Sequence, residues 1–161
     1  MDFLEIDALV TGILNSDSAV KQDLGRRFAL RLGLEPGKAG ADGGVDGWGM
    51  LNQRRIYFQC KLYAKRLDAS FAADFCGNLV IHQADVGVLL SGLGCTSGYE
   101  TRLQSFYEGL QAFAGGVMAQ TLTTHLLSLE DVFAETEAFA TAQRDLPDLR
   151  DLRDENSSSW L

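Results

Sequence analysis

Residues 45–63 read VDGWGMLNQRRIYFQCKLY, and this stretch indicates the fold. Apolar and polar side chains alternate on both sides of Asn52-Gln53, which is typical of two strands joined by a tight turn. We therefore predict a hairpin with strands over residues 45–51 and 54–63. In the second strand Gln59 and Lys61 share one face, because side chains of a strand alternate between its two faces.

Helices are predicted on both sides of this hairpin. Apolar residues recur at three- and four-residue intervals over residues 3–14, 18–32 and 68–81. Dense glycine over residues 35–44 predicts a loop. After the hairpin we predict a buried strand over 85–91, a helix over 99–113, a strand over 116–128 and a helix over 129–142. This order of elements predicts an α/β domain.

Length and composition limit the classes of protein to consider. The chain has 161 residues, which suits one domain, and we assign residues 1–143 to it and residues 144–161 to an acidic tail or linker. No apolar run reaches the roughly 18 residues of a membrane span, so we expect no membrane partner. Three widely spaced cysteines predict reduced thiols and a cytoplasmic protein.

The charge is unevenly distributed along the chain. The net charge is −8, and all of it comes from residues 81–161, because acidic and basic residues balance over residues 1–80. This balance disfavours a general nucleic-acid coat protein but leaves room for an enzyme that contacts a few phosphates. Five basic residues cluster within 13 positions: Arg54, Arg55, Lys61, Lys65 and Arg66.

Two short motifs carry the chemistry. The first is DGGVDG at residues 42–47, and the second is Gln59-Cys60-Lys61 at the end of the second hairpin strand. If the neighbouring strand enters at Asp46, a carboxylate, an amide oxygen, a backbone carbonyl and an ammonium group meet at one strand edge. Such oxygen ligands suit Mg²⁺. The motifs therefore predict a magnesium site with a lysine beside it.

These motifs, with the FCGNL run at residues 75–79 and the VGVLLS run at residues 86–91, resemble the catalytic core of the Mrr-type restriction endonuclease family. That family belongs to the PD-(D/E)xK nuclease superfamily, and the resemblance covers roughly residues 18–125. It implies a restriction-endonuclease-like, three-layer fold with a mixed central sheet flanked by helices. It also implies Mg²⁺-dependent cleavage of DNA phosphodiesters, with Mn²⁺ as a substitute metal.

The resemblance implies roles for particular residues. Asp46 is the metal-binding aspartate, Gln59 replaces the usual acidic ligand with the Cys60 carbonyl beside it, and Lys61 is the catalytic lysine. An additional acid would be Asp23 of the predicted helix or Asp42 of the glycine-rich loop. The other helix register would place the neutral Gln22 at the helical position instead. The candidate phosphate contacts are Arg54, Arg55, Lys65 and Arg66.

The resemblance also implies partners. Cutting both strands of DNA needs two sites, so we expect a homodimer or a higher oligomer. Nothing in the chain selects a target, so we expect a fused or partnered sensor domain, as in an anti-phage or restriction effector.

Two other functions stay open. One is a nuclease fold that binds DNA or a partner without cutting, which the neutral Gln59 and the acidic second half of the chain favour. The other is a nucleotide-binding protein that uses the Gly92–Gly98 turn, although its glycine spacing differs from the usual dinucleotide motif.

Overall fold

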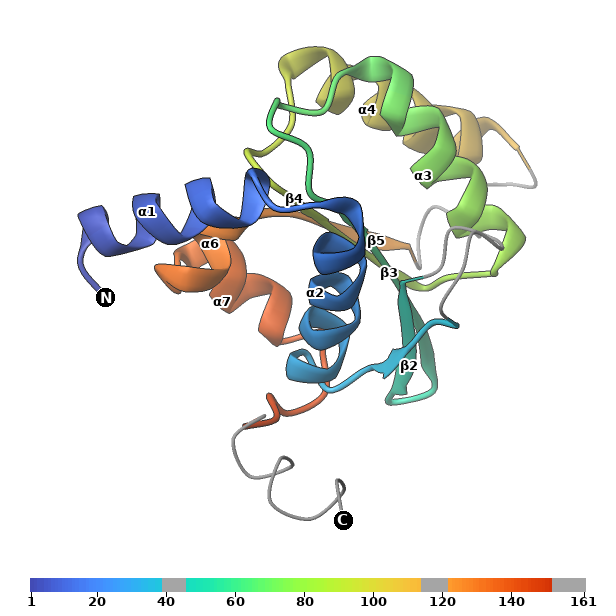
Figure 1. Ribbon diagram of the computed structural model, residues 1–161. Helices are drawn as coiled ribbons and strands as arrows, with labels where there is room; N and C mark the ends of the chain where they lie inside the picture. Colours follow the sequence, from blue (N-terminus) through green and yellow to red (C-terminus); the bar gives the residue numbers. More distant parts are fainter. Residues whose placement is uncertain (39–45, 114–121, 152–161) are drawn as a thin grey trace.

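The computed structural model describes residues 1–38, 46–113 and 122–151, and Figure 1 shows the arrangement of its elements. The described residues form an α/β domain. The helices are α1 (Phe3–Leu14), α2 (Ser18–Arg31), α3 (Ala69–Ile81), α4 (Ser97–Ala112), α6 (Leu129–Phe133) and α7 (Glu137–Gln143). The strands are β1 (Glu35–Pro36), β2 (Gly47–Leu51), β3 (Arg54–Lys61), β4 (Val86–Ser91) and β5 (Thr123–Ser128).

The sheet is mixed and has the order β1-β2-β3-β4-β5. Strands β1, β2 and β3 pair antiparallel, whereas β4 and β5 continue the sheet in parallel. The predicted hairpin is confirmed, and its turn residues Asn52 and Gln53 have φ of 51° and 65°. Positive φ at both turn positions is the feature of the hairpin turn that matches strand twist.

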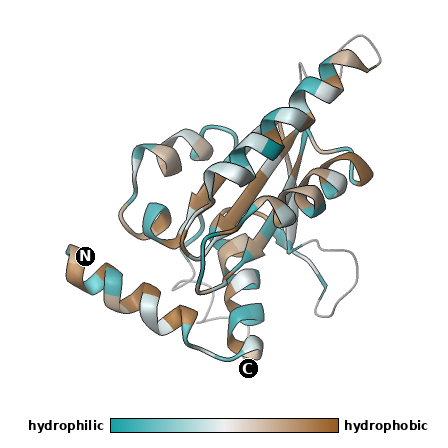
Figure 2. Ribbon diagram, turned by 90° about the horizontal axis from the view of Figure 1, so that it is seen from above, coloured by the Kyte–Doolittle hydropathy of each residue, from teal (hydrophilic) through white to brown (hydrophobic). Residues whose placement is uncertain are grey.

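Helices cover both faces of the sheet, so the domain has three layers (Figures 1 and 2). On one face α1, α2, α6 and α7 enclose the larger core, which includes Phe28, Ile56 and Phe58. On the other face α3 and α4 enclose a second core, which includes Tyr57, Phe75 and Leu89. Figure 2 shows the brown, apolar strands between the two helical layers.

Two glycines allow helices to lie close to the sheet. A Cβ at Gly47 would come within 2.7 Å of Ala29 Cβ, so α2 packs directly on the start of β2. A Cβ at Gly87 would come within 2.4 Å of the Leu79 side chain and 3.2 Å of the Phe75 ring, so α3 packs on β4 in the same way. All six residues of β4 are buried, as its sequence predicts.

Two predicted elements need correction. The predicted helix over residues 129–142 is wrong, because the chain breaks it into α6 and α7. Asp131 accepts hydrogen bonds from Ser128 and Thr136, and Glu135 takes a φ of 50°, so the turn between the helices is fixed. Within the predicted loop at residues 35–44, Glu35 and Pro36 instead form the short edge strand β1, where proline is tolerated.

The packed chain continues beyond the predicted boundary at residue 143. Asp145 contacts Arg54 at 3.0 Å and His125 at 2.8 Å, and Leu146 is buried. The Arg150 amide donates to the Arg31 carbonyl, and the Arg31 side chain donates to the Arg150 carbonyl. Residues 144–151 therefore belong to the domain. No helix in the described ranges has the length and apolarity needed to cross a membrane.

Candidate functional site

The hairpin places Asp46 beside the end of β3. The backbone amide of Asp46 donates to the Phe58 carbonyl at 3.1 Å, which continues the β2–β3 ladder by one residue. The Asp46 carboxylate then accepts a 2.7 Å hydrogen bond from the backbone amide of Cys60 through Oδ2. The Asp46 side chain thus takes the place of the backbone acceptor that would pair next with β3. The carboxylate is thereby fixed beside Cys60.

The Cys60 carbonyl faces the same strand edge. The N–H and C=O of one strand residue point to the same side, and the Cys60 N–H points to Asp46. The Cys60 thiol does not offer a thiolate, because burial raises its pKa and keeps it protonated. Cys60 therefore offers its backbone oxygen, not its sulfur, as a donor atom.

A cavity of about 370 Å³ opens between this edge and the N-terminal half of α2. Its lining contains a carboxylate, two lysines and an amide side chain. The residues that line it are Ser18, Lys21, Gln22, Gly25, Asp46, Cys60, Lys61, Leu62 and Tyr63. Asp46, Cys60 and Lys61, predicted to act together, all line this cavity.

Burial raises the pKa of Asp46 above its ordinary value of 3.8. The hydrogen bond from Cys60 and the positive charge of Lys61 act in the opposite direction, because both favour the ionised carboxylate. The site therefore holds a carboxylate that is partly stripped of water. Such a group gains from a bound cation more than an exposed carboxylate does, since the cation removes its desolvation cost.

Gln59 and Lys61 are connected through a residue that the sequence analysis missed. Gln59 is 1% exposed, and its Nε2 donates to Asp74 Oδ2 at 3.0 Å. Lys61 Nζ lies 4.0 Å from the same oxygen, and the Lys61 side chain is 30% exposed, so it reaches solvent. Asp74 lies on α3, whose sequence we interpreted through its apolar face alone. A polar residue one turn after the helix start was the only signal.

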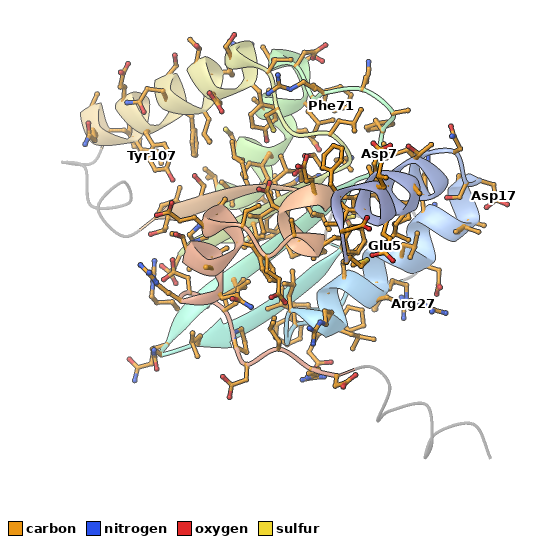
Figure 3. The ribbon with its side chains drawn as sticks, turned by 90° about the vertical axis from the view of Figure 1, so that its left-hand side faces the viewer. Glu5, Asp7, Asp17, Arg27, Phe71 and Tyr107 are labelled. Atoms are coloured by element: carbon orange, nitrogen blue, oxygen red, sulfur yellow. The ribbon has the colours of Figure 1, made fainter. Side chains whose placement is uncertain are left out.

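The additional acid predicted from α2 is not in the cavity. Asp23 pairs with Arg27 at 2.8 Å, and the two side chains are 59% and 65% exposed. Arg27, labelled in Figure 3, extends outward from α2. Gln22, the alternative register, is the residue that lines the cavity. The other predicted acid, Asp42, lies outside the described residues.

Two of the predicted phosphate contacts are far from Lys61. Arg54 and Arg55 begin β3, and seven residues at about 3.3 Å each separate Arg54 from Lys61 by about 23 Å. Arg54 binds Asp145 and Thr123, so it ties β3 to β5 and to the C-terminal segment. The structure does not bring this arginine pair together with the lysine.

The other two basic residues follow Lys61 directly. Lys65 Nζ lies 5.4 Å from the centre of the Phe71 ring, which Figure 3 labels at the start of α3. The Arg66 guanidinium donates to the Cys95 carbonyl at 2.6 Å. Both residues are exposed and lie at the same end of the sheet as the cavity.

The Gly92–Gly98 turn is used for packing. A Cβ at Gly92 would come within 2.5 Å of both the Leu14 side chain and the Tyr63 carbonyl. The Thr96 hydroxyl accepts from the Tyr99 amide at 3.3 Å and so caps α4. The packing around Gly92 and the helix cap at Thr96 thus give both residues a structural role that needs no nucleotide.

The donor set fits a hard cation with few protein ligands. Within the described ranges no group of three or more His, Cys, Asp or Glu side chains lies together as a metal site. Mg²⁺ requires only one or two carboxylates, because waters and substrate phosphate complete its shell. The Asp46 carboxylate and the Cys60 carbonyl meet that requirement. Comparisons with protein-family models, curated proteins and solved structures gave no significant match.

Proposed function

We propose that this chain is a metal-dependent nuclease that hydrolyses DNA phosphodiester bonds with Mg²⁺, and that Mn²⁺ substitutes for it. One observation carries the proposal: the Asp46 carboxylate is fixed on the Cys60 amide in a cavity that Lys61 also lines. A carboxylate, a strand carbonyl and a lysine that line one cavity would suit phosphodiester hydrolysis, which develops negative charge on the phosphate.

Each side chain has a role in this proposal. Asp46 and the Cys60 carbonyl would hold the metal. Gln59, which the resemblance implies as a further ligand, is buried outside the cavity lining and donates its nitrogen to Asp74, so its role would be to support the strand end. The bound metal would lower the pKa of a water molecule and neutralise phosphate charge. Lys61 would hold the attacking water or the phosphate oxygen. Asp74 would keep Gln59 and Lys61 in position.

The order of the motifs along the fold also supports the proposal. Gln59-Cys60-Lys61 ends β3, the FCGNL run lies within α3, and VGVLLS is β4. These three motifs therefore lie on a strand, a helix and a strand, in the order that the resemblance implies, whereas residues 42–45 of the DGGVDG motif lie outside the described residues. Phe75 and Leu79 pack on Gly87, which gives that run a structural role in joining α3 to the sheet.

The wider assignment follows from the same proposal. A protein with one such site per chain would act on double-stranded DNA as a homodimer or a higher oligomer. We infer that it works in the cytoplasm against foreign DNA, with a fused or partnered sensor domain that selects the target.

A second candidate function is a nuclease fold that binds DNA without cutting it. The observation in its favour is that amides occupy two positions where carboxylates would strengthen the metal site. Gln22 lines the cavity and Gln59 lies behind it, so Asp46 is the only carboxylate among the described residues of the lining.

One assay separates the two functions. Supercoiled plasmid is incubated with the protein and Mg²⁺ or Mn²⁺, beside Asp46→Ala and Lys61→Ala. Asp23→Ala is the matched control, because it removes an aspartate that points to solvent. If the protein is a nuclease, we expect metal-dependent nicking. Asp46→Ala and Lys61→Ala should lose it, and Asp23→Ala should retain it. Plasmid binding without nicking in either metal would support the binding module and overturn the nuclease.

A further inference from the structure

A second hollow lies on the face of the hairpin that also carries Gln59 and Lys61. Trp48 pairs with Tyr57, and Met50 pairs with Arg55, so these four side chains share one face of the β2–β3 ladder. Asp46 lies two residues before Trp48, next to the first residue of β2. Trp48 and Met50 remain 54% and 57% exposed.

The hollow has a volume of about 370 Å³, which is in the range of small-ligand sites. Its lining is aromatic and apolar, with one cation at its rim. The residues are Trp48, Gly49, Met50, Arg55, Ile56, Tyr57, His82 and Ala84. The His82 ring stacks on Tyr57, with ring centres 5.5 Å apart and planes 10° apart.

The lining has one cationic side chain, Arg55, and the Asp85 carboxylate accepts from the Arg55 backbone amide at 2.8 Å. The Arg55 side chain donates to the neutral Gln83 amide oxygen at 3.0 Å. Within the described residues its guanidinium makes no ion pair. A ligand with a flat aromatic ring and a neighbouring anionic group would fit this hollow. Bases stack on aromatic side chains, and phosphates bind arginine.

We propose that this hollow binds one unstacked base of the DNA strand whose phosphate lies at Asp46 and Lys61. The position of that phosphate rests on the proposed function. Two strand residues separate Trp48 from Asp46 by about 6.6 Å, so a base on Trp48 belongs to a nucleotide next to the scissile phosphate. Arg55, further along the same face, contacts the sugar–phosphate on the far side of that base.

Fluorescence of Trp48 tests the proposal directly. The chain has two tryptophans, so Trp160→Phe leaves Trp48 as the only reporter. A twelve-nucleotide thymidine strand is titrated into this variant, with EDTA present so that nothing is cut. Saturable quenching is expected with this strand, and none is expected with an abasic strand of equal length.

Affinity measurements on variants provide the second readout. Trp48→Ala is expected to weaken binding of the thymidine strand at least about fivefold, and Trp48→Phe is expected to preserve most of it. Phe3→Ala is the matched control, because Phe3 is a 70% exposed aromatic residue on α1, which covers the opposite face of the sheet. Its affinity is expected to stay unchanged.

Three outcomes would overturn the proposal. Equal binding of the thymidine and abasic strands would show that no base is held. Equal affinity for thymidine monophosphate and for the strand would identify a free-nucleotide site. A loss of self-association in Trp48→Ala, seen by sedimentation, would show that Trp48 contacts a second copy.

The test distinguishes this proposal from the nuclease proposal. Base-dependent quenching without plasmid nicking would keep the base site and overturn the nuclease. Nicking with a Michaelis constant that Trp48→Ala leaves unchanged would keep the nuclease and overturn the base site.

Discussion

Gln59 and Asp74, fifteen residues apart, are joined by a 3.0 Å hydrogen bond that crosses from β3 to α3. The same Asp74 oxygen lies 4.0 Å from Lys61 Nζ. One carboxylate on the helix therefore orients both polar side chains at the end of the strand.

Asp74→Ala is expected to reduce the rate of nicking by about 10- to 100-fold, which is the usual cost of losing a group that orients a metal-site residue. Asp74→Asn retains an acceptor oxygen for Gln59 but loses its charge, so it is expected to fall between Asp74→Ala and the unmodified protein. The measurement is the nicking rate across a series of pH values and Mg²⁺ concentrations. Equal rates in Asp74→Ala and Asp23→Ala would contradict this role.

Asp46→Asn is expected to abolish nicking and to stabilise the fold. Burial raises the pKa of Asp46, so above that pKa the folded chain carries a charge that is better solvated in the unfolded chain. The variant removes this cost. Its gain in Tm without metal is expected to be larger at pH 7 and to shrink as the pH falls through the raised pKa towards 3.8.

Thermal unfolding of the two proteins in EDTA, followed at pH 7 and at pH 4, provides the measurement for Asp46→Asn. Mg²⁺ is then expected to raise the Tm of the unmodified protein alone. A lower Tm for the variant at pH 7 would show that the carboxylate stabilises the fold, contrary to this expectation.

Gln22→Glu is expected to tighten Mg²⁺ binding, because it would add a second carboxylate to the cavity that Asp46 lines. The measurement is the Mg²⁺ concentration that gives half-maximal nicking or half-maximal stabilisation. Gln111→Glu, an exposed position near the end of α4, makes the same chemical change outside the cavity and is the control. If both variants required the same Mg²⁺ concentration, position 22 would not contribute to the metal site.

Gln53→Gly is expected to stabilise the domain by about 1 kcal/mol, because Gln53 takes a φ of 65° that costs an L-residue about that much. Gln104→Gly, in the middle of α4 and exposed, is the matched control and is expected to destabilise by about 1 kcal/mol. Chemical denaturation measures both. If both substitutions changed the free energy of unfolding in the same direction, the positive φ at Gln53 would not explain the result.

Arg54→Ala is expected to affect the stability of the fold, whereas Arg55→Ala is expected to affect DNA binding. Arg54 binds Asp145, Thr123 and the Asp85 carbonyl, so its loss is expected to destabilise the fold by about 1–3 kcal/mol. Arg55→Ala is expected to leave the Tm nearly unchanged and to weaken binding of single-stranded DNA. Denaturation and strand-binding titrations on the same two variants separate these effects.

The hairpin could be predicted from sequence because its signals are local. Alternation along residues 54–61 sets which side chains share a face, and two turn residues set the register. The buried strand β4 and the helices α1 to α4 follow from the same kind of periodicity. The break between α6 and α7 depends on side-chain bonds of Asp131, which periodicity does not show.

The site was predictable only in part for the same reason. Asp46, Cys60 and Lys61 lie on one hairpin, so spacing along the chain brings them together. Asp74 comes from a helix packed on the sheet, and its partners depend on tertiary contacts. Basic residues that are neighbours in sequence, such as Arg55 and Lys61, are separated because an extended strand carries them to opposite ends.

The contact between Gly47 and Ala29 has a consequence for ion choice. It fixes the distance from α2 to the hairpin at the residue next to Asp46, so the wall that carries Gln22 cannot move independently of the core. A rigid gap discriminates by ionic radius, since Ca²⁺ takes longer metal–oxygen distances and more ligands than Mg²⁺. A larger side chain at position 47 would push the helix outward and favour the bigger ion, although every ligand would be unchanged.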